Sequence, residues 1–182
     1  MSIKIIKPGL CSTIQDLGRT GFRSTGIGPG GVMDFFAASV ANHLVGNDKN
    51  QPVIEMHFPA AEILFETNAL ISVAGANFDA HINDAAIEMH QPFFVQKNSI
   101  LSFKKNISGA RVYLATNRTM EVENWLGSYS TNLKAKAGGI KGRLLQKDDT
   151  IETAAYTARI NSNKISVYFC RISSCFNCIF FL

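Results

Sequence analysis

The sequence lacks several features that would assign a function class on their own. It has no long block of Lys or Arg, because the 18 basic residues are scattered over 182 positions and the net charge is only +4. This pattern does not support a nucleic-acid-binding surface. The N-terminus has lysines but no apolar run of the length that a signal peptide needs. The apolar stretch at 165–182 is too short to cross a membrane and contains Arg171. We therefore expect a cytoplasmic protein with reduced cysteines and no membrane segment.

Familiar catalytic and metal-binding motifs are also missing. The four histidines show neither H-x-x-x-H nor H-E-x-x-H spacing, so we expect them to be structural or at the surface. Three cysteines near the C-terminus have no nearby fourth ligand, which disfavours a zinc site. No nucleophile elbow and no Ser-His-Asp order is present, so a self-contained hydrolase is not expected. The residues in question are His43, His57, His81, His90, Cys170, Cys175 and Cys178.

What the chain does have is the composition of a folded globular domain and one early helix. Hydrophobic residues make up 46% and charged residues 18% of the sequence. Apolar residues recur at helical spacing over 33–45, which predicts a helix with one apolar face. Asp34 lies where a carboxylate can cap the first turn, and Gly46 is a typical C-terminal stop. The apolar positions are Met33, Phe36, Ala37, Val40, Ala41, Leu44 and Val45.

From residue 53 onward the pattern changes to short strand-like runs with turn residues between them. Eight such runs are expected, at 53–58, 61–66, 69–75, 78–83, 85–89, 92–96, 99–104 and 110–116. Turn signals about every ten residues are typical of an antiparallel barrel or sandwich. One helix followed by many strands predicts a mainly β fold rather than alternating β and α elements. Residues 125–150 form a polar, glycine-containing connection of the kind that often holds a binding site.

Residues 26–31 match the dinucleotide-binding pattern G-x-G-x-x-G. A helix follows and Glu55 lies downstream, as that pattern requires. The preceding segment GRTGFRST is polar and broken by glycine, whereas a dinucleotide-binding unit needs a buried strand there. We therefore interpret these glycines as a turn that leads into a capped helix.

A longer signature begins at Pro8. The segment PGLCSTIQDLGRTGFRSTGIGPGGVMD at 8–34, the run IEM at 54–56, VAGANFDAHIN at 73–83 and LGSYSTNLKAKAGGIKGRLLQKDDTI at 126–151 recur in one family. Together they resemble the biotin-dependent carboxyltransferase family, which includes the C subunit of 5-oxoprolinase, the second subunit of allophanate hydrolase, part of urea carboxylase and the Kip-type regulators. The similarity covers about residues 3–152 and is greatest to the N-terminal half of the 5-oxoprolinase C subunit.

The resemblance implies a cyclophilin-like antiparallel β-barrel with the one early helix. Residues 1–152 would be the N-terminal part of a carboxyltransferase/allophanate hydrolase subunit 2 domain. Residues 153–182 differ in character from the family, and we expect them to be an atypical tail from truncation or a frameshift. The family's G-G pair after the Y-L-A strand is replaced by Asn117-Arg118-Thr119, so that loop is altered.

Two sets of polar residues within the signature are candidates for substrate binding. An Arg fork can hold a carboxylate and a Gln amide can both donate and accept, which suits small amide and carboxylate substrates. A local role is about as well supported, since Asp16 and Arg19 can staple a turn and Asp34 can cap the helix. Hydroxyls in a Gly/Ser loop can receive a phosphate, or can simply form solvated turns. The first set is Gln15, Asp16, Arg19 and Asp34, and the second is Ser128, Ser130, Thr131 and Arg143.

The function that the resemblance implies is membership of an ATP-dependent 5-oxoprolinase complex. Such a complex phosphorylates the lactam so that its oxygen becomes a leaving group, and hydrolysis then gives glutamate. Arg19 would hold the substrate carboxylate, Gln15 and Asp16 would orient the amide, and 128–131 would face phosphate. The expected partners are proteins like the B and A subunits of 5-oxoprolinase, and the complex would use ATP with Mg²⁺.

Two alternatives remain open. One is an allophanate or urea carboxyltransferase subunit, which would need carboxybiotin, although the sequence has no biotin-accepting M-K-M. The other is a non-catalytic regulator that binds a kinase-inhibitor partner.

Overall fold

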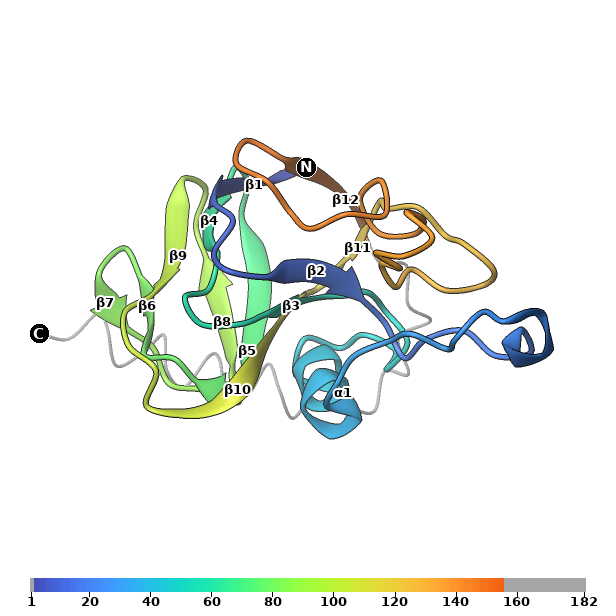
Figure 1. The fold of residues 1–182 in the computed structure, drawn as a ribbon. Helices are drawn as coiled ribbons and strands as arrows, with labels where there is room; N and C mark the ends of the chain where they lie inside the picture. The colour runs from blue at the N-terminus through green and yellow to red at the C-terminus, as the bar shows by residue number, and fades with distance from the viewer. Residues whose placement is uncertain (1, 156–182) are drawn as a thin grey trace, which may run out of the picture.

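The computed structural model describes residues 2–155, which form two antiparallel sheets and one α-helix (Figure 1). The seven-stranded sheet has the order β11-β12-β1-β4-β9-β6-β7. Its strands are β1 (Ser2–Lys7), β4 (Glu62–Phe65), β6 (Ala80–Ile82), β7 (Ala85–Ala86), β9 (Ser99–Phe103), β11 (Arg118–Met120) and β12 (Thr150–Ala155). The five-stranded sheet has the order β2-β3-β10-β5-β8. Its strands are β2 (Ser12–Gln15), β3 (Val53–Met56), β5 (Ala69–Asn77), β8 (Pro92–Val95) and β10 (Ser108–Thr116).

The prediction of a mainly β fold with one early helix is confirmed. All eight expected strand-like runs contain a strand, β3 to β10. Apolar side chains of each of these strands are buried except in β7, whose two alanines are exposed. Four further strands were not expected, namely β1, β2, β11 and β12. Within the described residues both sheets are open-ended, so the strand pairing gives two sheets and closes no barrel.

The main core lies between the two sheets. Side chains that alternate along β1 and β4, such as Ile5 and Ile63, are fully buried against residues of the five-stranded sheet such as Ile54 and Leu114. Phe78 lies at the end of this core and makes edge-to-face contacts with Phe58 and Phe103.

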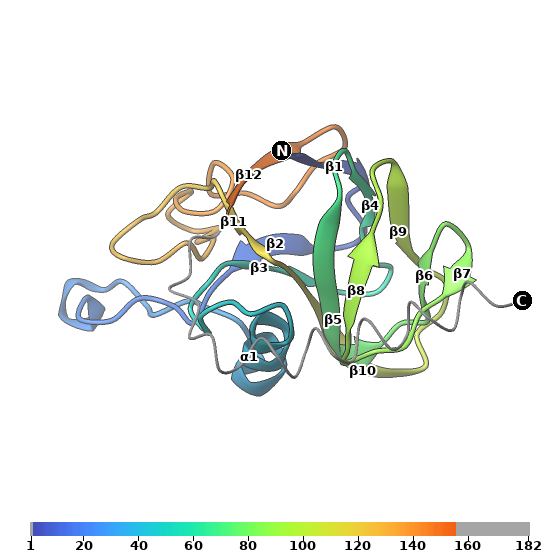
Figure 2. The same ribbon diagram turned by 180° about the vertical axis from the view of Figure 1, so that it is seen from behind.

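The helix α1 (Phe35–Leu44) lies on the other face of the five-stranded sheet, as Figure 2 shows from behind. It packs through the small residues Ala37, Ala38 and Ala41, which lie against Tyr113 and Ala115 of β10 among others. Small side chains let the helix approach the sheet closely, and that contact determines which side of the helix is buried.

The helix orientation corrects part of the predicted apolar face. Met33 is 70% exposed and Phe36 is 80% exposed, although both were expected to be on the buried side. The periodicity over 33–45 is compatible with more than one rotation of the helix, and packing of the alanines decides between them. The helix itself is two residues shorter at its N-terminal end and one at its C-terminal end than the expected range.

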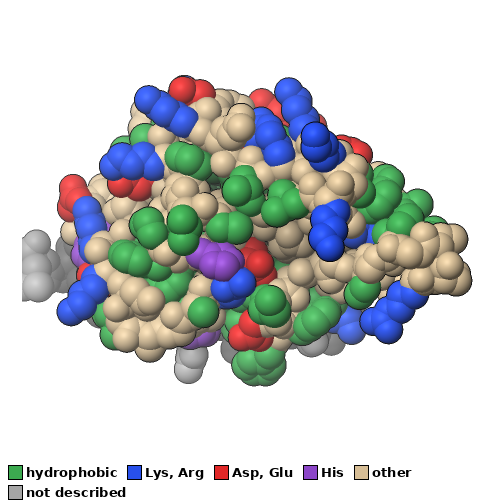
Figure 3. All heavy atoms as spheres, in the orientation of Figure 1, with side chains coloured by type: hydrophobic (Ala, Val, Ile, Leu, Met, Phe, Trp, Pro, Cys, Tyr) green, Lys and Arg blue, Asp and Glu red, His purple; other side chains and the backbone are tan. Residues whose placement is uncertain are grey.

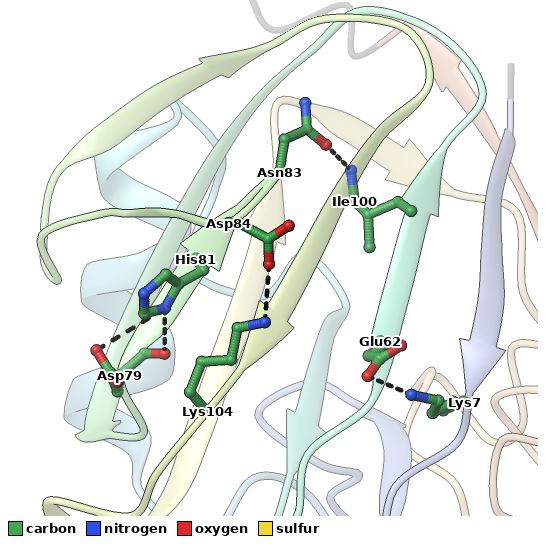
Figure 4. Close-up of polar contacts among 8 residues, drawn as sticks. All are labelled: Lys7, Glu62, Asp79, His81, Asn83, Asp84, Ile100 and Lys104. Atoms are coloured by element: carbon green, nitrogen blue, oxygen red, sulfur yellow. Dashed lines mark hydrogen bonds and ion pairs between the residues drawn. The ribbon is translucent and has the colours of Figure 1, made fainter.

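The outer surface of the seven-stranded sheet carries polar pairs at solvent-exposed positions. Figure 4 shows Lys7 on β1 paired with Glu62 on β4 at 2.7 Å, and Lys104 paired with Asp84 at 2.9 Å. His81 on β6 places Nδ1 2.9 Å from the backbone oxygen of Asp79, in line with the structural or surface role expected for it. Exposed ion pairs of this kind contribute little to stability, so this surface tells us little about function.

Candidate functional site

Asp16 is the centre of the polar cluster that the sequence singled out. It directly follows β2 and is 6% exposed. Its Oδ1 accepts from the backbone N–H of Gly18 at 2.7 Å and from the hydroxyls of Ser128 and Ser130 at 2.6 and 2.5 Å. Its Oδ2 accepts from the backbone N–H of Tyr129 at 2.7 Å. Four donors thus surround one carboxylate, which compensates for its removal from water.

The structure joins most of the two predicted sets, which are more than a hundred residues apart, into one cluster. Ser128 and Ser130 are fully buried, and both donate to Asp16. Thr131 is 6% exposed and its Oγ1 donates to the backbone oxygen of Ile14 on β2. In this geometry the loop at 128–131 is fastened to the end of β2. A substrate-binding role for these hydroxyls stays a prediction.

Arg19 is the member of the cluster that leaves the most hydrogen-bonding atoms without a partner. Its side chain is 2% exposed, and Nη2 donates to the backbone oxygen of Ser130 at 2.6 Å. Its guanidinium lies 4.7 Å from the centre of the Trp125 ring, a cation–π contact. Nε and Nη1 are buried and have no hydrogen-bond partner. Burial lowers the pKa of Arg19 from its ordinary value, and the nearby Asp16 partly opposes that shift.

A pocket of about 330 Å³ opens beside Arg19. It is lined by Arg19, Thr20, Gly21, Arg23, Ser24 and Pro29. Arg19 lines this pocket, although its unpartnered Nε and Nη1 are themselves shielded from solvent. A guanidinium that borders a pocket and keeps unpartnered N–H groups is a candidate for binding an anion.

Two glycines in the segment that matches G-x-G-x-x-G pack closely on their surroundings, Gly30 against this guanidinium and Gly31 against the backbone of Gly18. A Cβ atom on Gly30 would lie 2.9 Å from Arg19 Nη1, and one on Gly31 would lie 2.9 Å from the backbone N of Gly18. Both have positive φ, 62° and 94°, which other residues rarely adopt. The interpretation of the motif as a turn rather than a dinucleotide site is therefore supported by the structure, because this turn packs directly on Arg19.

The remaining predicted residues lie in other surroundings. Asp34 caps α1, with its side chain accepting from the backbone N–H of Ala37 at 2.9 Å. Arg143 forms a two-pronged ion pair with Asp149, with both N–H···O contacts at 2.7 Å. Gln15 is 8% exposed, donates to Thr13 and leaves its Oε1 without a hydrogen-bond partner. Of these three, only Gln15 has a buried side-chain polar atom without a hydrogen-bond partner.

The structure also shows a second polar cluster that the sequence did not single out. Glu55 on β3 accepts through Oε2 from the backbone N–H of Met33 at 2.8 Å and from the hydroxyl of Tyr113 at 2.9 Å. Burial raises the pKa of Tyr113, and the nearby carboxylate of Glu55 adds to the shift. Arg111 on β10 lies beside Glu55, with Nε 3.7 Å from Oε1. The signal that could have found this cluster is Glu55 itself, a charged residue inside an apolar strand run.

Among residues 2–155 no group of His, Cys, Asp and Glu is placed to hold a metal ion. The three cysteines Cys170, Cys175 and Cys178 lie outside the described residues, as do most of the expected tail at 153–182 and the apolar stretch from 165. In the part of the chain that the structure describes, no helix combines the length and the hydropathy needed to cross a membrane.

Comparison with known proteins gives a consistent result. The family model described as "Carboxyltransferase domain, subdomain A and B" matches residues 25–172. The chain is 38% identical over 149 residues to the 5-oxoprolinase C subunit of Escherichia coli, which covers 82% of this chain and 48% of that protein. It is 36% identical over 151 residues to urea amidolyase of Saccharomyces cerevisiae, which covers 82% of this chain and 8% of that protein.

Solved structures resemble the fold equally clearly. The Kluyveromyces lactis urea amidolyase superimposes with a TM-score of 0.81 at 34% identity, over 84% of this chain and 9% of that one. The protein TTHA0988 gives a TM-score of 0.77 at 27% identity, over 87% of this chain and 33% of that one. The chain spans about half the length of the curated 5-oxoprolinase subunits that it matches, at 48% and 46%.

Proposed function

This chain belongs to the carboxyltransferase domain family, and we propose that it acts as one component of an ATP-dependent 5-oxoprolinase complex. The complex would convert 5-oxoproline to glutamate by activation and hydrolysis of the lactam. The observation that carries the proposal is the buried guanidinium of Arg19, which borders the pocket and whose Nε and Nη1 have no hydrogen-bond partner. The likeness to the C subunit of a 5-oxoprolinase supports the same choice.

Arg19 suits the carboxylate of 5-oxoproline. A carboxylate can accept two parallel hydrogen bonds from one guanidinium, and such charge-assisted pairs are stronger in a buried setting. Arg23 lines the same pocket and adds a second positive charge. Urea carries no carboxylate, so this geometry favours 5-oxoproline over urea as the ligand of the pocket.

The neighbours of Arg19 hold it in place. The backbone oxygen of Ser130 accepts from Nη2, and Ser130 is in turn fastened by its hydroxyl to Asp16. Because both carboxylate oxygens of Asp16 already accept from protein donors, we propose that Asp16 is a positioning residue for the 128–131 loop. Gln15 Oε1 is buried and unpartnered, and remains the candidate from this set for the substrate amide.

The described residues do not fit ATP at the position expected for its phosphates. Ser128 and Ser130 are fully buried and donate their hydroxyls to Asp16, so this loop does not present them to a phosphate. We therefore propose that the A-like and B-like partner proteins provide the site for ATP and Mg²⁺, and that this chain contributes binding of 5-oxoproline.

The test is a reconstitution of the complex. The chain is co-expressed with its A-like and B-like partners, and ADP and glutamate are measured as a function of 5-oxoproline. Arg19→Met is expected to lower kcat/KM about 100-fold, as expected for loss of two charge-assisted hydrogen bonds. Lys104→Met removes one positive charge from the far side of the seven-stranded sheet and serves as the matched control. Full turnover by Arg19→Met would contradict the proposal.

A second candidate is an allophanate or urea carboxyltransferase subunit, which the likeness to urea amidolyases favours. That reaction needs carboxybiotin from a partner. The same reconstitution distinguishes the candidates when urea with a biotinylated carrier replaces 5-oxoproline. Binding of the partners without any substrate-stimulated ATP hydrolysis would instead indicate a non-catalytic regulator.

A further inference from the structure

The sequence contains one tryptophan, Trp125, to which the proposed function gives no role. The guanidinium of Arg19 lies over its ring, with Cζ 4.7 Å from the ring centre. Arginine packs favourably on an aromatic face, because its planar cation is attracted by the π-electrons and is weakly hydrated. Trp125 is partly buried whereas Arg19 is 2% exposed, so the indole is one of the groups that separate Arg19 from solvent.

The backbone around Trp125 fixes where the indole lies. The N–H of Trp125 donates to the oxygen of Ser128 at 2.8 Å, and the N–H of Ser128 donates back at 3.3 Å. Leu126 and Gly127 between them both have positive φ, 54° and 76°, as a type I′ turn requires. The hydroxyl of Ser128 donates to Asp16 at 2.6 Å. One tight turn therefore connects the indole to the carboxylate that holds the 128–131 loop.

Hydrogen bonds alone do not fix the orientation of the Arg19 side chain. Nη2 donates to the backbone oxygen of Ser130 at 2.6 Å, whereas Nε and Nη1 have no partner. A single hydrogen bond holds one corner of a guanidinium and leaves its plane free to tilt about that corner. Gly30 limits the edge at Nη1, where a Cβ atom would lie only 2.9 Å away. The face of the guanidinium is limited by the ring of Trp125.

The two chain segments that contact Arg19 carry basic side chains and no acidic ones. These segments are residues 20–30 and 126–142. Figure 1 places both on the same side of the molecule, and in Figure 3 Lys and Arg side chains are more frequent on that side, the right of the view, than Asp and Glu. A surface of one charge attracts the opposite charge, so this side attracts anions toward the pocket beside Arg19. The basic residues are Arg23, Lys134, Lys136 and Lys141, all of them exposed.

We infer that Trp125 is a positioning residue that holds the plane of the Arg19 guanidinium for an anionic ligand. A carboxylate accepts two parallel hydrogen bonds from one guanidinium only when the two groups are nearly coplanar, so a tilt of the guanidinium weakens the pair. The inference rests on the proposed function, in which Arg19 binds the carboxylate of 5-oxoproline. It gives Trp125 no contact with the ligand, because the indole acts through Arg19.

The first test measures KM and kcat in the reconstituted complex. Trp125→Leu keeps an apolar side chain but removes the aromatic face, and is expected to raise KM for 5-oxoproline about tenfold with kcat unchanged, because binding weakens equally in the ground and transition states. Trp125→Phe keeps an aromatic face and is expected to stay within about threefold of the original KM. Phe94→Leu, at a position 55% exposed on β8, is the matched control and should leave KM unchanged.

A merely structural role gives a different result. Loss of folded protein lowers kcat in proportion and leaves KM as it was, and that result with Trp125→Leu would overturn the inference. Equal KM in Trp125→Leu and the original complex would overturn it as well. So would a tenfold rise in KM for Trp125→Phe, since an aromatic face would then not be sufficient.

A double variant tests whether Trp125 acts through Arg19. In Arg19→Met the guanidinium is absent, so adding Trp125→Leu is expected to lower kcat/KM no further. An additional loss of about tenfold in the double variant would show that the indole contributes independently of Arg19, and would overturn the inference.

A measurement without substrate separates this inference from the proposed function. Hydrogen exchange of the Arg19 Nε–H is followed by NMR in the ¹⁵N-arginine-labelled full-length chain, and Arg19→Met identifies the signal. We expect exchange to be slow in the original chain and in Trp125→Phe, and about tenfold faster in Trp125→Leu. Equal exchange in all three would overturn the inference. If Arg19→Met keeps full turnover while Trp125→Leu still loses protection, the proposed ligand fails and the positioning of Arg19 by Trp125 stands.

Discussion

Asp16 shows how one residue can hold distant parts of the chain together. Its carboxylate accepts from residues 128, 129 and 130 as well as from Gly18. The sequence indicated Asp16 and Arg19 as a concentrated polar pair, and a turn-stapling ion pair was one interpretation. In the structure Arg19 instead donates to the backbone oxygen of Ser130, and Asp16 accepts from the hydroxyls of Ser128 and Ser130 in the same loop.

Replacing Asp16 is expected to destabilise the fold. In Asp16→Asn one oxygen becomes an NH₂ group; placed at the Oδ2 position it faces the N–H of Tyr129, so that hydrogen bond is lost, and the three donors to Oδ1 lose their charged acceptor. We expect the free energy of unfolding to fall by about 3 kcal/mol. Urea unfolding followed by circular dichroism measures the change. Asp84→Asn, on the exposed turn after β6, is the control and is expected to have no measurable effect. A loss in Asp16→Asn no larger than in this control would contradict the role assigned to Asp16.

Arg143 and Asp149 give a pH dependence that can be measured. The hydrogen bonds from Arg143 hold the pKa of Asp149 below its ordinary value of 3.8, although burial partly opposes the shift. A depressed folded-state pKa stabilises the protein above the unfolded value, and this contribution is lost as pH falls through the folded-state pKa.

We therefore expect Asp149→Asn to lower stability at neutral pH and to flatten the loss of stability between roughly pH 4 and pH 2. Urea unfolding at a series of pH values compares it with the original chain. A parallel pH profile for the two proteins would show that this ion pair does not contribute to acid unfolding.

At the scale of secondary-structure elements, the sequence of α1 predicted the residues that cap and stop the helix. It did not predict which side of the helix is buried. The N-terminal cap at Asp34 and the stop at Gly46, which has a φ of 80°, are both present as predicted. These signals are local, since they depend on backbone groups within a few residues. The buried side of the helix depends on what it packs against, and Ala37, Ala38 and Ala41 occupy it instead of Phe36.

The cap makes a prediction that separates two roles of Asp34. Asp34→Ala is expected to lower the free energy of unfolding by about 1 kcal/mol, whereas Asp34→Asn should keep most of the cap. Thermal and urea unfolding measure both. If Asp34 also contacts substrate, Asp34→Asn will be stable and yet impaired in 5-oxoproline turnover. Equal loss of stability in both variants would show that charge, rather than the side-chain oxygen, stabilises the helix end.

The strands that were not expected differ in how clearly the sequence indicates them. β1 has the alternation Ile3 and Ile5 inward with lysines between, a pattern that could have identified it. β11 is three residues long and pairs with β12, which follows the long polar connection. Short polar strands of this kind form because a neighbouring edge is available, and sequence periodicity does not show that edge.

At the scale of the whole molecule, the two sheets depend on one shared core. Phe78 is fully buried and contacts both Phe58 and Phe103. Phe78→Ala is expected to cost about 4 kcal/mol of unfolding free energy because it leaves a large cavity. Phe36→Ala, at a position 80% exposed, is the matched control and should change stability little. Similar losses in the two variants, measured by urea unfolding, would contradict this assignment of the core.

The sequence by itself determined the strand-rich fold, the helix and its cap, and the family, because these depend on local periodicity, local hydrogen bonding and a distributed signature. It also identified Asp16, Arg19, Ser128 and Ser130 as candidates. Only the tertiary structure decided that they form one cluster, that Asp34 and Arg143 are engaged elsewhere, and that Glu55 lies beside Arg111. Those outcomes depend on strand register and on which polar atoms remain unpaired after packing, and both are set by contacts between residues far apart in the chain.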